Sequence, residues 1–329
     1  MSTKVAVIIP AYRAARTIVS VVHSVPHSIA MIYVVDDCCP EASGRVVEEV
    51  VDDPRVTVIR NSRNLGVGGA TLTGYRAAFE DGANIAVKLD GDGQMDATLI
   101  PDLIQPLIRG DADYVKGNRF YFLGSLRGMP RTRLFGNAVL SFVAKFTTGY
   151  WNVMDPTNGF TALRLELLPF LETEKIHSRY FFETDMLFRL GLLRAVVQDY
   201  PMDAKYDDEN SSLKLSTALF TFSFRHLRNF FKRVFYVYFL RDFSAGTIQL
   251  VSGTGCLAFG MIFGAVHWID SIAKGEVASA GTVMVAGLPI MVGIQLLIAA
   301  INWDISSTPT RPIHLRLRIE RLDASDRKK

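Results

Sequence analysis

Residues 85–94, IAVKLDGDGQ, join a short apolar run to a turn rich in aspartate and glycine. The apolar run over 85–89 predicts a buried strand that ends at Asp90. Ligands of α/β folds bind at the carboxyl edge of the sheet, which is where such a strand delivers Asp90. The glycines allow a tight turn, so we expect Asp92 and Gln94 to point the same way. Three oxygen ligands on one side favour Mg²⁺ or Mn²⁺, with diphosphate oxygens completing the coordination.

Two plainer interpretations of this turn stay open. It is compatible with a solvated acidic turn or with a calcium loop. The EF-hand spacing is absent, because no flanking helices and no glutamate at the twelfth position accompany it. A metal here would neutralise charge on a leaving nucleoside diphosphate.

Outward from this turn, strands alternate with helices. Apolar runs predict strands over 5–9, 31–35 and 56–59, and another begins at Tyr114-Val115. Helical spacing appears over 14–25, 43–51, 68–79, 99–108 and 180–193, and a short strand is predicted over 195–200. The alternation predicts a mostly parallel, doubly wound α/β sheet. Many α/β folds share this pattern.

The ends of the neighbouring strands carry residues suited to a nucleotide. A tyrosine ring stacks on a base, an aspartate accepts from a base N–H or a ribose hydroxyl, and a helix N-terminus suits phosphate. The candidates are Pro10 and Tyr12, Asp36 and Asp37, and Asn64 and Gly66. The alternative for the glycine-rich loop is a tight turn without a ligand.

The composition separates a polar part of the chain from an apolar part. Of 329 residues 49% are hydrophobic, and the apolar residues concentrate after about Gly246. The net charge of +3 says little about partners, and we expect no nucleic acid among them. Cys38, Cys39 and Cys256 form neither a disulfide framework nor a CxxC motif, which fits a reducing cytosolic setting. The first apolar stretch is too short for a signal peptide, so we expect the N-terminal domain to stay cytosolic.

The C-terminal part predicts attachment to a membrane. Basic residues recur at spacings of three and four among phenylalanines over 215–241, which is typical of an interfacial amphipathic helix; a core helix is the alternative. Residues 247–269 and 277–303 contain no Asp, Glu, Lys or Arg, and each run is long enough to cross ~30 Å of hydrocarbon. Basic residues are dense on both sides of this hairpin and sparse in its loop, which places both ends in the cytoplasm.

We therefore predict four regions along the chain. They are a cytosolic catalytic domain over 1–214, amphipathic juxtamembrane helices over 215–245, two transmembrane helices within 246–303 (about 247–269 and 280–303), and a basic, partly disordered cytoplasmic tail over 304–329. Gly260 and Gly264 form a GxxxG pair that permits close helix approach and a homo-oligomer. The expected location is the bacterial inner membrane.

Four segments resemble a known family when taken together. PAY at 10–12, VVDD at 34–37, NLGVGGA at 64–70 and DGDGQ at 90–94 resemble, in this order and spacing, the GT-A-fold family 2 glycosyltransferases, over about residues 4–214. Within that family the DxDxQ form, the segment 180–185 (YFFETD) and a C-terminal pair of spans resemble the polyprenyl-phosphate glycosyltransferases, which include dolichyl-phosphate mannose synthase.

The resemblance implies a role for individual residues. For the donor nucleotide it implies Pro10, Tyr12, Asp36, Asp37, Asn64, Gly66, Asp90 and Lys205; for the metal, Asp90, Asp92 and Gln94; for the acceptor phosphate, Arg119 with Arg131 or Arg133; and for orienting the sugar, Asp155 and Glu183. Where the family has Asn-Glu after the tyrosine, this sequence has Arg13-Ala14. The resemblance therefore does not fix which residue contacts the base. The family's glycine before the late Ser-Lys-Leu is also absent. The match that assigns Lys205 to the donor phosphate is therefore incomplete.

We expect metal-dependent, inverting transfer of a sugar from a UDP- or GDP-linked donor to a polyprenyl phosphate at the cytoplasmic membrane face. Asp92, Asp155 and Arg119 would carry the chemistry, and an anionic acceptor needs no general base. One alternative is a neutral lipid acceptor, with Asp155 or Asp185 as base. Another is a non-catalytic scaffold that binds nucleotide sugars, against which the intact metal turn argues.

Overall fold

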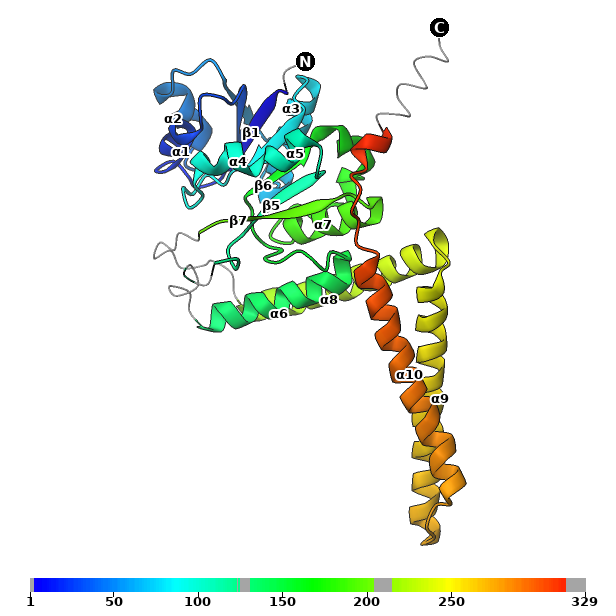
Figure 1. Cartoon of the computed structure of the whole chain (residues 1–329). Helices are drawn as coiled ribbons and strands as arrows, with labels where there is room; N and C mark the ends of the chain where they lie inside the picture. The colour runs from blue at the N-terminus through cyan, green and yellow to red at the C-terminus, as the bar shows by residue number, and fades with distance from the viewer. Residues whose placement is uncertain (1–2, 123, 125–130, 204–214, 318–329) are drawn as a thin grey trace. The chain divides into compact units, whose positions relative to one another are not determined.

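A mostly parallel sheet of seven strands, in the order β3-β2-β1-β4-β6-β5-β7, organises the first part of the chain (Figure 1). The computed structural model describes residues 3–122, 124, 131–203 and 215–317, and the side chains of 131–133 and 215–221 lie outside that description. The strands are β1 Val5–Ala11, β2 Met31–Asp36, β3 Val56–Arg60, β4 Ile85–Lys88, β5 Tyr114–Asn118, β6 Thr161–Arg164 and β7 Val197–Pro201. The predicted doubly wound α/β class is therefore confirmed.

Strand β6 is the exception to the parallel order, and the sequence did not reveal it. It pairs antiparallel with both β4 and β5, with Val87 opposite Ala162 and Val115 opposite Ala162. At four residues it is too short for a clear period of two. Its insertion is important for the site, because it brings the turn before it beside the carboxyl end of β4.

Helices cover both faces of the sheet. Alternate residues of β1 show the division, because Val7 and Ile9 pack into one core and Ala6 and Ile8 into the other. One face is covered by α1 Ile18–Ser24, α2 Ser43–Val50, α4 Ile100–Leu103 and α5 Gln105–Arg109; the other by α3 Val67–Glu80, the 3₁₀ segment η2 Leu165–Phe170 and α7 Phe182–Leu193. The short 3₁₀ segments η1 Ala97–Leu99 and η3 Thr173–Lys175 and the longer α6 Arg131–Thr148 complete this part.

The helix predicted over 99–108 is divided in the structure. Two helices, α4 and α5, replace it, and each has a proline at its first or second position. Proline has no N–H to donate to a preceding turn, so Pro106 favours the start of a new helix over continuation of the old one.

The chain forms two compact units. One comprises Met1–Phe230 with Pro309–Lys329, and the other comprises Phe231–Thr308. Helix α8, Leu215–Val234, runs from the first into the second, where the π-helix η4 Phe235–Arg241, α9 Ala245–Lys274 and α10 Ala280–Ser306 follow. Helices α9 and α10 are long and apolar enough to cross a membrane, and they pack side by side as a hairpin (Figure 1).

Glycines set the close contact inside this hairpin. A Cβ at Gly253 would lie 3.1 Å from the carbonyl oxygen of Gly293, and one at Gly260 only 2.7 Å from that of Ala286. The GxxxG pair therefore serves packing within the chain. In the last turn of α8, Arg233 forms an ion pair with Asp304 of α10.

The predicted tail over 304–329 differs in its first part. Asp304–Ser306 complete α10, and the residues from Pro309 return to the first unit. His314 is buried there, with its Nδ1 2.5 Å from Asp113 Oδ1. The other oxygen of Asp113 accepts from the N–H groups of Val196 and Ile313. The N–H of His314 is a fourth donor, so the buried carboxylate of Asp113 holds this segment against the first unit. A count of basic residues cannot reveal such a contact.

Candidate active site

The turn after β4 is built on a buried lysine. Lys88 is fully buried, and its Nζ lies 2.5 Å from Asp90 Oδ1 and 3.2 Å from Glu183 Oε1. Glu183 stands in the first turn of α7, so this helix brings its carboxylate to the sheet edge. Burial alone would lower the pKa of Lys88, but the charges of Asp90 and Glu183 outweigh it and raise that pKa well above its ordinary value. The lysine stays protonated and charged.

Glu183 feels the opposite balance. Burial raises the pKa of its carboxyl group above the ordinary value, against the attraction of Lys88, and the charge of Asp90 adds to the increase. The structure thus holds Glu183 beside Asp90. Its expected role in orienting the sugar stays a prediction.

Asp92 and Gln94 complete the acidic turn on its exposed side. Gly93 has a φ of 80°, which gives the tight reversal that the sequence predicted, and the N–H of Gln94 donates to Asp92 Oδ1 at 3.0 Å. Within the described ranges, no three His, Cys, Asp or Glu side chains converge to hold a metal ion. Two carboxylates and one amide oxygen are hard ligands, so they fit Mg²⁺ or Mn²⁺ that takes its remaining ligands from a diphosphate.

The two aspartates after β2 both accept bonds from the loops around them. Asp36 accepts from the N–H groups of Cys39 and Gly44, each at 2.7 Å. Asp37 accepts from the N–H groups of Leu65 at 2.9 Å and Gly66 at 2.7 Å, and from Asn61 Nδ2. Both carboxylates are buried. Both aspartates therefore stabilise the conformation of the surrounding loops. Their expected contacts with the nucleotide stay predictions.

Tyr12 and Arg13 form an exposed edge above these loops. Pro10 lies within the buried β1, whereas Tyr12 is 45% exposed. The guanidinium carbon of Arg13 lies 5.6 Å from the centre of the Tyr12 ring, and Arg13 has a φ of 56°. A non-glycine residue in this conformation is uncommon and marks a constrained loop.

The loop that carries Asn64 opens α3 through a close backbone contact. Gly66 caps this helix with a φ of 82°, and a Cβ there would lie 2.7 Å from the carbonyl oxygen of Ser178. No residue with a side chain fits this position without strain. The loop is thereby held against the segment that precedes α7.

Arg119, just after β5, is held by Asp155. Its Nε lies 2.7 Å from Asp155 Oδ2 and its Nη2 lies 2.7 Å from Oδ1, which is a bidentate pair. Asp155 is 1% exposed and has a φ of 54°. Burial would raise the pKa of Asp155, but the Arg119 guanidinium outweighs it and holds that pKa below the ordinary value.

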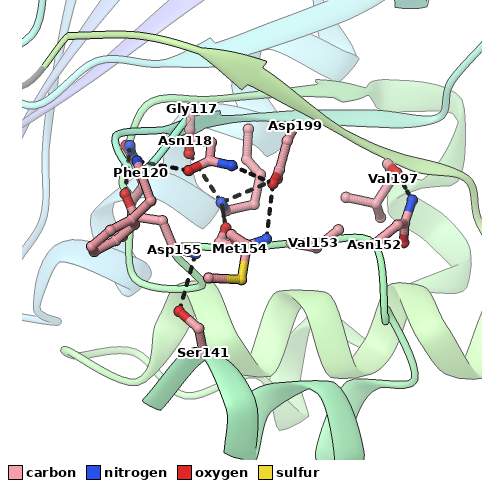
Figure 2. Close-up of polar contacts among 12 residues, drawn as sticks. Gly117, Asn118, Phe120, Ser141, Asn152, Val153, Met154, Asp155, Val197 and Asp199 are labelled. Carbon is pink, nitrogen blue, oxygen red and sulfur yellow. Dashed lines mark hydrogen bonds and ion pairs between the residues drawn. The ribbon is translucent and has the colours of Figure 1, made fainter. Parts of the chain in front are cut away.

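A second buried lysine fixes the residue before Asp155 (Figure 2). Lys116 Nζ donates to the carbonyl oxygen of Met154 at 2.5 Å and lies 3.5 Å from Asp199 Oδ1. Asp199 Oδ2 accepts in turn from the N–H of Met154 and from Asn118 Nδ2, both at 2.8 Å. Ser141 Oγ accepts from the N–H of Asp155 at 3.2 Å. These bonds hold both polar groups of Met154, so the strained Asp155 has a fixed support.

The turn that starts at Asp155 joins the two halves of the site. Asn158 Nδ2 donates to Asp155 Oδ2 at 3.3 Å, and the carbonyl oxygen of Gly159 accepts from Lys88 Nζ at 3.4 Å. A Cβ at Gly159 would lie 2.5 Å from both Asp90 Oδ2 and Lys88 Nζ. The structure therefore brings together the Asp90 turn, Glu183, Asp155 and Arg119.

Some predicted residues lie outside this description. Lys205 is outside the described residues. Arg131 and Arg133 fall in the first turn of α6, and their side chains are outside the described part. The sequence analysis missed Lys88, Lys116 and Asp199. A lysine inside an apolar strand run, as in IAVKLD, was the signal available for the first two.

Comparisons with known proteins show the family of the chain. The family model described as glycosyl transferase family 2 matches residues 6–170. A UDP-N-acetylglucosamine–dolichyl-phosphate N-acetylglucosaminyltransferase of Methanococcus voltae is 34% identical over 53% of this chain and 74% of its own length. An undecaprenyl-phosphate mannosyltransferase of Micrococcus luteus is 30% identical over 52% of this chain and 70% of its own length.

A solved structure shows the same fold. Glucosyl-3-phosphoglycerate synthase from Mycobacterium tuberculosis, in complex with Mn²⁺, UDP-glucose and phosphoglyceric acid, superposes with a TM-score of 0.51 and 20% identity, over 70% of this chain and 80% of its own. The fold of the sheet agrees with that of the solved structure, and the match of the family model identifies the family. The chain is a glycosyltransferase that belongs to glycosyl transferase family 2.

Proposed function

We propose that this enzyme transfers a sugar from a nucleoside-diphosphate sugar to a polyprenyl phosphate at a membrane surface. The observation that carries the proposal is the short turn from Asp155 to Gly159, which contacts Arg119 at one end and Lys88 at the other. A carboxylate turn suited to a metal and donor diphosphate is thus joined to a guanidinium suited to a second phosphate. Relatives named for dolichyl-phosphate and undecaprenyl-phosphate acceptors support the same choice.

Helix α8 supports a lipid surface as the place of reaction. It buries His226 and Asn229 and leaves Phe224 and Leu227 exposed, by 70% and 54%. Asn229 Nδ2 donates to Asp185 Oδ1 at 3.0 Å, so the side of this helix that carries His226 and Asn229 packs inward, whereas Arg228 and Lys232 are exposed like Phe224 and Leu227. An exposed apolar side is unfavourable in water and favourable at the edge of a bilayer. Two apolar helices that follow in sequence add a membrane attachment.

In the proposed mechanism, the chain's own residues position two anions. Asp92 and Asp90, with Gln94, would hold Mg²⁺ or Mn²⁺, which when bound neutralises charge on the departing diphosphate. Tyr12 and Asp37 would hold the base and ribose. Arg119 would bind the acceptor phosphate, whose oxygen attacks the anomeric carbon directly and so inverts it.

A neutral lipid acceptor would need a general base, and the structure argues against both candidates. Asp155 has a lowered pKa and both oxygens on Arg119. Asp185 is buried and accepts from the N–H of His177 and from Asn229. A carboxylate whose oxygens are occupied by such donors is poorly placed to take a proton from an acceptor hydroxyl. The phosphate acceptor, which requires no base, is the better match.

The test is a transfer assay in detergent with undecaprenyl phosphate, Mg²⁺ or Mn²⁺, and a panel of UDP- and GDP-sugars. We expect a chelator-sensitive lipid product, and loss of at least about 100-fold in kcat for Asp92→Asn with unchanged folding. Full activity of Asp92→Asn in the presence of chelator would exclude the metal role. Transfer to diacylglycerol but not to undecaprenyl phosphate would exclude the proposed acceptor.

A further inference from the structure

The pair Lys88–Asp90 places a fixed positive charge inside a site expected to take a dication. Lys88 is the last residue of β4, and its Nζ contacts Asp90 Oδ1 at 2.5 Å, Glu183 Oε1 at 3.2 Å and the Gly159 carbonyl oxygen at 3.4 Å. Its ammonium group is therefore surrounded by acceptors of the site itself. Water does not compete for it, because the side chain is 0% exposed.

This contact limits what Asp90 offers to a metal. Oδ1 is engaged by the ammonium group, whereas Oδ2 lies close to the backbone of Gly159, which has no side chain. Coordination of a metal by both oxygens of Asp90 would therefore require Lys88 to give up its contact with Oδ1. Asp92 lies on the exposed side of the turn.

The charges act in the same direction. As ionised groups, Asp90 and Glu183 would give the buried cluster a charge of −2, and the Lys88 ammonium reduces it to −1. The ammonium therefore weakens the attraction that the two carboxylates exert on a free dication, and low dielectric strengthens this effect. A nucleoside diphosphate adds several negative charges and so compensates for the Lys88 charge.

We propose that Lys88 is a positioning residue that weakens binding of the free dication and so couples metal entry to binding of the donor diphosphate. The inference rests on the proposed metal-dependent transfer. It assigns to Lys88 a function in the order of assembly of the site, beyond its structural pairing with two carboxylates.

The experiment measures Mn²⁺ binding to the purified full chain in detergent by electron paramagnetic resonance, without nucleotide and with UDP or GDP. We expect weak binding of Mn²⁺ alone to the wild type and tighter binding with one of the nucleotides. Lys88→Met should tighten binding of Mn²⁺ alone by at least about tenfold, and the gain from nucleotide should shrink accordingly.

Two further variants separate the explanations. Lys88→Met with Glu183→Gln keeps one net negative charge in the cluster, so it should tighten Mn²⁺ binding as well if Lys88 acts by direct contact with Asp90. Lys116→Met is the matched control, because Lys116 is an equally buried lysine of the same sheet, lies in β5 and pairs with Asp199. It should leave the Mn²⁺ affinity unchanged.

The inference is overturned if Lys88→Met keeps the wild-type affinity for Mn²⁺, or if Lys116→Met tightens Mn²⁺ binding equally. Each of these results leaves the proposed transfer intact. By contrast, a wild type that binds no Mn²⁺ with either nucleotide would remove the metal role in the proposed function, and the inference with it.

Discussion

Asp155 combines a left-handed backbone with a buried, ionised side chain. Asparagine tolerates this backbone but carries no charge, so Asp155→Asn isolates the electrostatic contribution. Because the folded-state pKa of Asp155 is depressed, its contribution to stability is present above the unfolded-state pKa, about 4, and is lost as pH falls through the folded-state value. We expect the variant to lose about 2 kcal/mol at neutral pH, less than a fully buried pair would, since Arg119 is partly exposed.

Thermal unfolding of both proteins in detergent from pH 7 down to pH 3 checks this. The difference between them should narrow toward the acid end. A difference that stays constant or widens as pH falls would show that the charge of Asp155 is not what stabilises the turn.

Residue-scale roles were only partly predictable. Apolar runs made the strand termini readable and so located Asp36, Asp37, Asp90 and Asp92, whereas Arg119 was assigned only through the resemblance to the family. It could not predict that loop N–H groups occupy Asp36 and Asp37, since those donors depend on loop conformation. The partners of Lys88 and Lys116 come from α7 and β7, about a hundred residues away, and no local pattern records such a pairing.

At the scale of elements, the segment from Gly149 to Asp155 depends on the link between β5 and β7. Lys116 and Asp199 stand opposite each other in these parallel strands and bond to both polar groups of Met154. Removing one partner leaves the other buried and unpaired, so Lys116→Met and Asp199→Asn should each cost about 3–5 kcal/mol. The double variant should cost clearly less than the sum of the two.

A double-mutant cycle of thermal unfolding measures this coupling. Transfer kinetics add a second readout: the KM for polyprenyl phosphate should rise more than the KM for the donor, because Arg119 is held through Asp155. Strictly additive losses, or a selective donor defect, would contradict the supporting role of the pair.

The same scale shows why strand β6 was not predicted while the hairpin was. Long apolar runs without charge leave few alternatives to a pair of spans, whereas four residues of an antiparallel insertion resemble a loop. The sequence also permitted either intramolecular or intermolecular use of the GxxxG pair. Only the packing of Gly260 against α10 assigns it within the chain.

That packing gives a test with a control in the same helix. Gly260→Leu places a side chain where a Cβ already lies 2.7 Å from the Ala286 carbonyl oxygen, whereas nothing lies within 4 Å of a Cβ at Gly255. We expect Gly260→Leu to separate α9 from α10 and to lower the melting temperature of the hairpin, at a cost of about 1–3 kcal/mol. Gly255→Leu should be close to neutral; equal effects of the two substitutions would refute the close contact.

At the scale of the whole molecule, the chain leaves the first unit through α8 and returns to it after α10. The return is fastened by Asp113, which accepts from the N–H groups of Ile313 and His314 and from the imidazole of His314. The sequence suggested a disordered basic tail because it reports charge but not a buried acceptor 200 residues earlier. Burial would raise the pKa of Asp113, but the hydrogen bonds from His314, Val196 and Ile313 outweigh it and hold that pKa below its ordinary value.

This return has a consequence for topology that can be measured. Residues on both sides of the hairpin belong to one folded unit, so both ends of a membrane-spanning hairpin must emerge on the same face, and the loop near Gly275 on the other. Because Lys and Arg are dense at the two ends of the hairpin, we expect that face to be the cytoplasmic one. In a variant with Cys38, Cys39 and Cys256 replaced by serine, we expect Glu276→Cys to react with a membrane-impermeant maleimide in intact bacterial cells. Thr310→Cys should react only after permeabilisation, as should a cysteine at the exposed Ser20 of α1, which serves as the control. Labelling of positions 276 and 310 from the same side would mean that the two helices do not both cross the bilayer, and the lipid acceptor would then have to be reached from α8 alone.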